Sequence, residues 1–205
     1  MRSVFDQVCA GCSVGSLGPS LLFLVMAAGG MLMPRGLASA AEPKKETAIF
    51  AGGCFWGMEN IIREIPGVLS TEVGYTGGKF PNPTYQQVCT GLTGHAEAVQ
   101  IVYDPDVVSY ETLVDYFFRM HDPTTLNRQH NDIGTQYRSA IFYTTDEQRE
   151  IAEKAVLFLN QQKKFARPIV TQVVKASLFY PAEAYHQDYL VKNPAGYNCH
   201  VLRDW

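Results

Sequence analysis

The chain has 205 residues and a formal net charge of −3 at pH 7, with 17 basic and 20 acidic side chains. This balance provides no basic surface for nucleic acid, so we expect no nucleic-acid partner. Hydrophobic residues make up 46% of the chain and aromatic residues 12%, which argues against disorder and allows one domain with a sizeable core.

The first 40 residues differ from the rest of the chain. Residues 17–33 carry no charge, and residues 38–41 read Ala-Ser-Ala-Ala, a small-residue pattern that suits signal peptidase. We therefore expect an export signal cleaved near Ala40, and a periplasmic or otherwise exported protein. Two alternatives stay open: a membrane anchor formed by residues 17–33, or a cytoplasmic protein whose start codon lies downstream, at Met26, Met31 or Met33.

From residue 41 onward, apolar periodicity predicts alternating strands and helices. In the first half we expect strands at 47–50, 68–75 and 95–103, a helix at 54–65 and a helical turn at 84–88. In the second half we expect a helix capped by Ser109, a polar loop at 124–134, strands at 136–143 and 169–175, helices from Thr145 to about Lys164 and from Pro181 to Leu190, and a mobile tail from about 193.

The helix that begins at Thr145 carries two specific expectations. Thr145 and Gln148 have the spacing of a capping box. The expected buried stripe consists of Ile151 or Ala152, Ala155, Phe158 and Leu159.

The predicted order is β-α-β-β-α-β. It matches the split β-α-β pattern of a ferredoxin-like α/β (α+β) sandwich, here with an extra helix and an irregular C-terminal tail. We expect residues 41–205 to form this single domain. Such folds host many chemistries, so the function has to be argued from the site.

Cys54 is the first candidate for chemistry. It follows Gly52-Gly53, which permit a sharp turn, and it opens the helix predicted at 54–65. Backbone N–H groups and the dipole at a helix N-terminus favour a thiolate, so we expect a nucleophile there. The alternative is a buried cysteine that acts as a small hydrophobe. Phe55 and Trp56 follow directly, and at least one of them is expected to belong to the core.

Glu97 is the second candidate. It alternates in phase with Val99 and Ile101, so it is either partly buried beside them or exposed on an outward face. A buried carboxyl has a raised pKa and donates a proton near neutral pH.

The cysteines bound the remaining possibilities. Cys9 and Cys12 lie in the expected leader, which leaves Cys54, Cys89 and Cys199 in the mature chain. Three widely separated cysteines form neither a disulfide scaffold nor a zinc ribbon, and the Cys199-His200 pair is far from four metal ligands. We expect no metal and no cofactor.

Six motifs together resemble the A-type peptide methionine sulfoxide reductases (MsrA). They are Gly53-Cys-Phe-Trp-Gly57, Asn82-Pro-Thr-Tyr85, Thr93-Gly-His-Ala-Glu97, His121-Asp-Pro123, Asn131-Asp132 with Gly134-Thr-Gln-Tyr-Arg-Ser139, and Tyr185-His-Gln187 with Asn193-Pro-Ala-Gly-Tyr197. The resemblance spans about Ala48 to His200.

The resemblance implies a role for each matching residue. Cys54 is then the nucleophile that attacks the sulfoxide sulfur and becomes a sulfenic acid, and Glu97 is the acid that protonates the sulfoxide oxygen. The remaining implied roles are hydrogen bonding by Tyr85, Asp132 and Tyr137, and a pocket for the substrate methyl group made by Phe55 and Trp56.

The resemblance also implies a catalytic cycle. Cys199 resolves the sulfenic acid, and thioredoxin or a thioredoxin-like protein reduces the resulting disulfide. Relatives with a longer tail carry two terminal cysteines, whereas this chain has one, so we expect a one-disulfide cycle and give Cys89 a packing role. The expected protein is a monomer that reduces the S epimer of methionine sulfoxide, in proteins and as the free amino acid, and so repairs oxidative damage.

Two rival functions stay open at this point. A cysteine hydrolase or acyltransferase would pair Cys54 with a histidine base, for which His95 and His186 are the candidates. A non-enzymatic binding module would use the aromatic pair after Cys54 as a contact surface.

Overall fold

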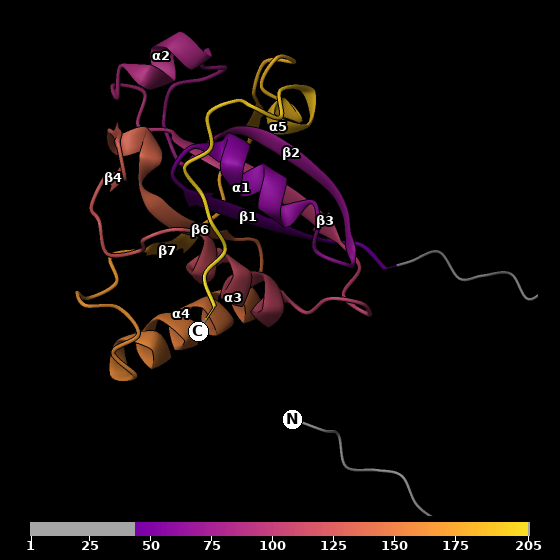
Figure 1. Cartoon of the computed structure of the whole chain (residues 1–205), viewed down its shortest axis with the longest axis vertical. Helices are drawn as coiled ribbons and strands as arrows, with labels where there is room; N and C mark the ends of the chain where they lie inside the picture. Colours follow the sequence, from indigo (N-terminus) through magenta and orange to yellow (C-terminus); the bar gives the residue numbers. More distant parts are fainter. Residues whose placement is uncertain (1–43, 205) are drawn as a thin grey trace, which may run out of the picture. The chain divides into compact units, whose positions relative to one another are not determined.

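The computed structural model describes residues 44–204 (Figure 1). The expected leader at 1–40, including the possible anchor at 17–33, lies outside this range. Within residues 44–204, no helix is long and apolar enough to cross a bilayer.

Residues 44–204 form a main sheet of six strands, a second sheet of two short strands, five α-helices and one 3₁₀ helix. The strands of the main sheet are β1 (Glu46–Gly52), β2 (Val68–Thr76), β3 (Ala96–Tyr103), β6 (Ser139–Tyr143), β7 (Gln172–Lys175) and β8 (Tyr180–Pro181). The helices are α1 (Phe55–Ile62), α2 (Tyr85–Cys89), α3 (Tyr110–Met120), α4 (Asp146–Gln161), α5 (Tyr189–Lys192) and a short 3₁₀ helix, η1 (Thr135–Tyr137). Two further short strands, β4 (Arg128–Gln129) and β5 (Asp132–Ile133), pair with each other.

The sheet order is β7-β6-β1-β3-β2-β8. Strand β3 lies between β1 and β2 and is antiparallel to both, so β1, α1 and β2 form a split β-α-β unit. Strand β6 pairs antiparallel with the other edge of β1, and β7 extends the sheet parallel to β6. The predicted α/β class and ferredoxin-like arrangement are confirmed.

The two faces of the sheet are covered differently. Alternate residues of β1, such as Ala48 and Phe50, join the main core with α1 and α3. The intervening residues, such as Ile49 and Ala51, face a smaller cluster that the segment around Phe179 covers. This alternation places Glu97 on the same face as the helices, because Val99 belongs to the main core and Ala98 to the smaller cluster.

Several predicted boundaries shift. The helix expected at 54–65 ends at Ile62, although Ile65 is buried as the periodicity predicts. The strand expected at 136–143 starts only at Ser139, because residues 135–137 form η1. The polar loop at 124–134 contains the small β4–β5 pair.

The helix expected from Pro181 to Leu190 is wrong at its start. Pro181 belongs to β8 and pairs with Gly74 of β2 at the edge of the sheet, where a residue without an N–H is tolerated. A Cβ on Gly74 would lie 2.4 Å from the Tyr180 carbonyl oxygen, so this pairing needs a glycine. Helix α5 forms only over Tyr189–Lys192.

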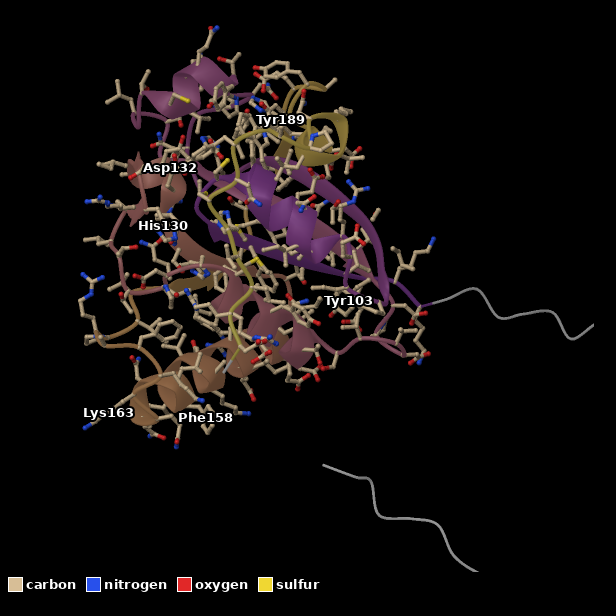
Figure 2. All side chains as sticks on the ribbon, in the orientation of Figure 1. Tyr103, His130, Asp132, Phe158, Lys163 and Tyr189 are labelled. Carbon is tan, nitrogen blue, oxygen red and sulfur yellow. The ribbon has the colours of Figure 1, made fainter. Side chains whose placement is uncertain are left out.

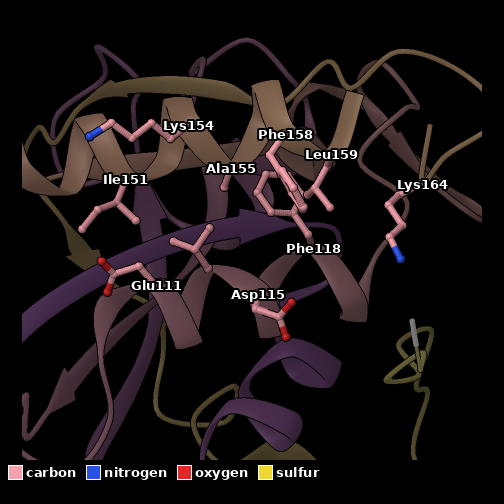
Figure 3. Close-up of a pocket in the computed structure, with 10 residues that line it drawn as sticks. Glu111, Asp115, Phe118, Ile151, Lys154, Ala155, Phe158, Leu159 and Lys164 are labelled. Carbon is pink, nitrogen blue, oxygen red and sulfur yellow. The ribbon is translucent and has the colours of Figure 1, made fainter. Parts of the chain in front are cut away.

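Two details of α4 also differ from expectation. Thr145 accepts a hydrogen bond from the Gln148 N–H, but the Gln148 side chain accepts from Thr144, so the capping box is incomplete. Ala152 and Leu159 are buried as predicted, whereas Phe158 is 56% exposed. Phe158 and Phe118 line an apolar groove of about 550 Å³ between α3 and α4 (Figure 3).

Candidate functional site

Cys54 lies at the junction of β1 and α1, as the sequence predicts. It is the N-cap residue of α1, and Gly53 before it has φ +111°, a conformation that favours glycine. A Cβ at Gly53 would lie 2.7 Å from Cγ of Gln129, so the turn is also too tight for a side chain. Cys54 is 7% exposed.

Glu97 on β3 is joined directly to the helix that carries Cys54. Its Oε2 accepts a hydrogen bond of 3.2 Å from the N–H of Phe55, the first residue of α1. The residue is 2% exposed, so the buried alternative for Glu97 is confirmed. Burial raises the pKa of this carboxyl to about 8, the charges of Asp132 and Cys199 act in the same direction, and the Phe55 N–H opposes them. Glu97 is therefore mostly a neutral acid at pH 7.

The thiolate expected at Cys54 stays a prediction, and the neighbours of Cys54 in this structure oppose its ionisation. The pKa of Cys54 is raised, first by a hydrogen bond with Cys199, then by burial and by the charge of Glu97. The Trp56 N–H at the helix start favours the thiolate but does not outweigh these effects. Because the largest cause comes from Cys199, withdrawal of that residue would ease ionisation of Cys54.

The predicted polar partners surround the carboxyl. Tyr85 opens α2 and Tyr137 ends η1, and both are half-buried. Burial, followed by the charge of Glu97, raises the pKa of both hydroxyls, so they stay protonated and able to donate hydrogen bonds. Asp132 on β5 has its pKa raised to about 6 by burial and by Cys199. The structure thus brings Glu97, Tyr85, Tyr137 and Asp132 together around Cys54, while their catalytic roles stay predictions.

The two aromatic residues after Cys54 point into different surroundings. Phe55 is 1% exposed and joins the main core, with its ring centroid 6.0 Å from that of Tyr75. Trp56 is half-buried and stacks on Tyr189 of α5, with ring centroids 3.7 Å apart and planes at 13°. The indole Nε1 also donates a 3.0 Å hydrogen bond to Nδ1 of His186. Figure 2 labels Tyr189 on α5.

The residues that hold the aromatic wall formed by Phe55 and Trp56 were not predicted in this role, and His186 was named only as a candidate base for a rival function. His186 and Tyr189 fix the plane of the Trp56 indole, and Glu183 accepts from the Tyr85 N–H (2.9 Å) and the Tyr75 hydroxyl (2.8 Å). Tyr185-His-Gln187 was the available signal, but the sequence placed it in a helix from Pro181. The contacts with His186 and Tyr189 fix the orientation of the Trp56 ring beside Cys54.

The C-terminal tail covers the site. The thiol of Cys199 is hydrogen-bonded to Cys54 and to Asp132, and the Tyr197 hydroxyl donates to Oδ2 of Asp132 at 3.2 Å. A Cβ at Gly57 would lie 2.5 Å from Oδ1 of Asn198, so the space that Gly57 leaves open is filled by the tail. The structure brings Cys199 to Cys54 as expected, and the mobility of the tail stays a prediction.

Arginine side chains secure the end of the tail. Arg203 donates from Nη2 to the carbonyl oxygens of Phe118 (2.8 Å) and His121, at the C-terminal end of α3. Arg119 donates in turn to the Arg203 carbonyl at 2.6 Å. These contacts satisfy carbonyl groups that the helix end leaves unpaired, and they fix the chain four residues beyond Cys199.

Cys89 departs from its expected packing role. It is exposed at the end of α2, and its thiol is hydrogen-bonded to the Tyr85 hydroxyl. In residues 44–204, no group of three or more His, Cys, Asp or Glu side chains is arranged to hold a metal ion.

Known proteins similar to this chain belong to the family that the site geometry indicates. A family model described as "Peptide methionine sulfoxide reductase" matches residues 46–204. The chain is 54% identical over 158 residues to peptide methionine sulfoxide reductase MsrA of Methanothermobacter thermautotrophicus, covering 77% of this chain and 93% of that protein.

Two solved structures of Mxr1 from Saccharomyces cerevisiae are also similar. The reduced form has a TM-score of 0.72 and 41% identity, and covers 78% of this chain and 93% of that one. Mxr1 in complex with Trx2 has a TM-score of 0.53 and 27% identity, with coverages of 82% and 97%. With a family model matching most of its length and a relative identical at more than half of the aligned positions, this chain belongs to the peptide methionine sulfoxide reductase family.

Proposed function

We propose that this protein is a peptide-methionine (S)-S-oxide reductase, in which Cys54 takes oxygen from the S epimer of methionine sulfoxide, in proteins and as the free amino acid. The observation that carries the proposal is the hydrogen bond from the Phe55 N–H to the buried Glu97 carboxyl. It places a neutral acid beside a nucleophilic sulfur, and reduction of a sulfoxide needs both.

Substrate binding uses the aromatic residues of α1. The methyl group of the sulfoxide lies against Trp56, whose plane is held by Tyr189 and His186, with Phe55 closing the inner side. The sulfoxide oxygen points toward Glu97 and the hydroxyls of Tyr85 and Tyr137. This orientation would select one epimer, because exchanging oxygen and methyl would place an apolar group against the acid.

In the reduction step, the Cys54 sulfur attacks the sulfoxide sulfur while Glu97 protonates the oxygen. The attack forms an S–S bond between Cys54 and the substrate as the S–O bond breaks. The hydroxyl group passes to the Cys54 sulfur while the S–S bond breaks, which leaves Cys54 as a sulfenic acid, Cys54–SOH, and releases the thioether. The thiol proton of Cys54 restores the Glu97 acid, so protons balance. The substrate sulfur gains two electrons and Cys54 loses two, which gives methionine and an oxidised enzyme.

In the recycling steps, Cys199 attacks the oxidised Cys54 and water leaves as the disulfide forms. The hydrogen bond between the two thiols supports this pairing. A thioredoxin-like protein then reduces the disulfide, a proposal supported by the similarity to Mxr1 solved in complex with Trx2. We further propose that the protein is a monomer and that it is exported through the leader at 1–40. N-terminal sequencing of the mature protein tests the export.

The rival hydrolase finds less support. Nδ1 of His186 accepts from Trp56, which turns the ring toward the aromatic wall. His95 packs edge-on against Tyr180, with a ring-centroid distance of 5.6 Å. In residues 44–204, neither histidine has a hydrogen bond to Cys54, as a base for that thiol would require.

A stoichiometric assay tests the proposal. The reduced protein, without any other reductant, is mixed with an excess of methionine-(S)-sulfoxide, and both methionine and protein thiols are counted. We expect about one methionine per chain and a Cys54–Cys199 disulfide in the mass spectrum, with Cys89 remaining free. Cys54→Ser should release no methionine, and a burst from that variant would end the assignment of Cys54.

A further inference from the structure

His200 is the residue next to Cys199, and its ring is turned back onto the Cys199 sulfur. Its Nδ1 lies 3.2 Å from Sγ of Cys199, and its Nε2 lies 2.9 Å from the carbonyl oxygen of Gly52. His200 is 3% exposed, and both ring nitrogens find their partners within the protein.

The Gly52 contact decides which nitrogen carries the proton of the neutral ring. A carbonyl oxygen only accepts, so Nε2 must be the donor and Nδ1 must present a lone pair to Cys199. Whenever Cys199 carries its proton, its thiol therefore donates toward a nitrogen that can take that proton.

The position of the ring is built into the backbone around Cys54. A Cβ at Gly57 would lie 2.6 Å from Nδ1 of His200, so only glycine leaves room for the ring. The His200 N–H donates to Oδ1 of Asn198 at 3.0 Å, which shapes the turn that carries Cys199. His200 is thus held by β1, by α1 and by its own turn.

We propose that His200 is the general base for Cys199, taking the thiol proton so that Cys199 attacks the oxidised Cys54. This inference rests on the proposed function and concerns only the resolution step. His200 contacts a reacting sulfur atom, so it acts as a catalytic residue.

The step balances. The S–H bond of Cys199 breaks and its proton moves to Nδ1 of His200. The Cys199 sulfur bonds to the Cys54 sulfur as the S–O bond of Cys54–SOH breaks, and the departing hydroxide takes the proton from Nδ1 to leave as water. The Cys54 sulfur gains one electron on going from the sulfenic to the disulfide level, the Cys199 sulfur loses one on going from the thiol to the disulfide level, and His200 returns to its neutral form.

Other titratable groups face this pair and set its pH dependence. They are Cys54 at the start of α1, Glu97 on β3, Asp132 on β5, His121 at the end of α3 and Tyr197 in the tail. The pKa of Cys199 is lowered, first by the hydrogen bond from Cys54 and then, against the effect of burial, by His200 and Asp132. Because Cys54 no longer has a thiol proton once it is a sulfenic acid, His200 is left as the main group that assists ionisation of Cys199.

The test separates the reduction step from the resolution step in the Cys89→Ser background. After rapid mixing with methionine-(S)-sulfoxide, methionine is counted in quenched samples, and disulfide is measured from the loss of free thiols. We compare His200→Gln, whose amide still reaches toward Gly52, with His130→Asn, a change at an exposed histidine with φ 50°.

We expect His200→Gln to release about one methionine per chain while disulfide formation at pH 6.5 slows by at least about 10-fold, toward the range typical of a lost general base. His130→Asn should form the disulfide at the wild-type rate. An unchanged rate of disulfide formation in His200→Gln would overturn the inference and leave the proposed function intact. Absence of a methionine burst in the wild type would instead overturn the proposed function.

A second measurement needs no activity. In Cys54→Ser/Cys89→Ser, alkylation of the single remaining mature-chain thiol reports the ionisation of Cys199 as a function of pH. We expect its midpoint to lie below that of an ordinary thiol, about 8.5, and to move up when His200→Gln is added. The same midpoint with and without His200 would overturn the inference.

Discussion

The start of α1 and the C-terminal tail supply the two sulfur atoms of the site in different ways. Cys54 is fixed by regular structure, since β1 ends just before it, α1 begins just after it, and Glu97 reaches it from β3. Residues 193–204 form no helix or strand. The side chains of Tyr197, His200 and Arg203 hold this segment in place through hydrogen bonds to the rest of the domain.

This difference matches the two halves of the proposed cycle. Reduction of the sulfoxide needs a nucleophile and an acid at fixed separation, which the sheet and helix provide. Resolution and recycling need a thiol that reaches Cys54 and later meets an external reductant. Contacts made by a few side chains are separable at modest cost, whereas strand pairing is not.

Removing the thiol of the tail should have the largest effect on turnover. We expect Cys199→Ser to release about one methionine per chain and then to stop, because thioredoxin would meet no disulfide. Steady-state turnover with thioredoxin, thioredoxin reductase and NADPH should fall to background. Cys89→Ser is the matched control and should cycle normally, and continued cycling by Cys199→Ser would show that another thiol resolves Cys54.

Loosening the tail without touching sulfur should give a smaller effect. Arg203→Gln removes charged donors from the carbonyl groups of Phe118 and His121, and such hydrogen bonds contribute about 1.5–3 kcal/mol each. We expect disulfide formation to slow by about 10-fold while the methionine burst persists. Arg167→Gln, which loses one ion pair at 3.6 Å between an exposed arginine and the half-buried Asp122, should match the wild type. Equal rates for the two variants would mean that Arg203 does not position Cys199.

Weakening the aromatic wall should affect substrate binding most mildly. Tyr189→Leu removes the stack on Trp56, and an aromatic pair of this kind is worth about 0.5–1.5 kcal/mol. We expect the KM for methionine sulfoxide to rise by roughly 2- to 10-fold, with little change in the rate of the burst. Tyr189→Phe keeps the stacked ring and should retain the wild-type KM, so an equal rise in both variants would point to the hydroxyl instead.

The same two regions explain what the sequence could predict. Paired glycines before a helix start identify Cys54 locally, and strand alternation allows Glu97 a buried place. The hydrogen bond between Glu97 and the helix that follows Cys54 depends on how β3 pairs within the sheet. No local sequence pattern predicts that pairing. The raised pKa of Cys54 was missed for the same reason, because its largest cause is Cys199, near the far end of the chain.

Edge and surface features were predicted least well. Pro181 suits a first helical turn as well as it suits an edge strand, and only the close approach to Gly74 decides between them. Phe158 has the spacing of a buried residue, but it lies in the groove between α3 and α4, where the core does not cover it. A free cysteine is usually buried like a small apolar residue. Cys89 is exposed because it is the last residue of the short helix α2.

The most direct test of the account is the pH dependence of the single-turnover methionine burst in wild type and Glu97→Gln. Since burial raises the pKa of Glu97 to about 8, the wild-type acid is protonated below that pH and lost above it. We predict that the wild-type rate falls as pH rises through about 8. Glu97→Gln should be slower by about 10²- to 10⁴-fold at pH 7 and should lack this fall. Equal burst rates in the two proteins at pH 7, or the same fall in both, would contradict the role of Glu97 as proton donor.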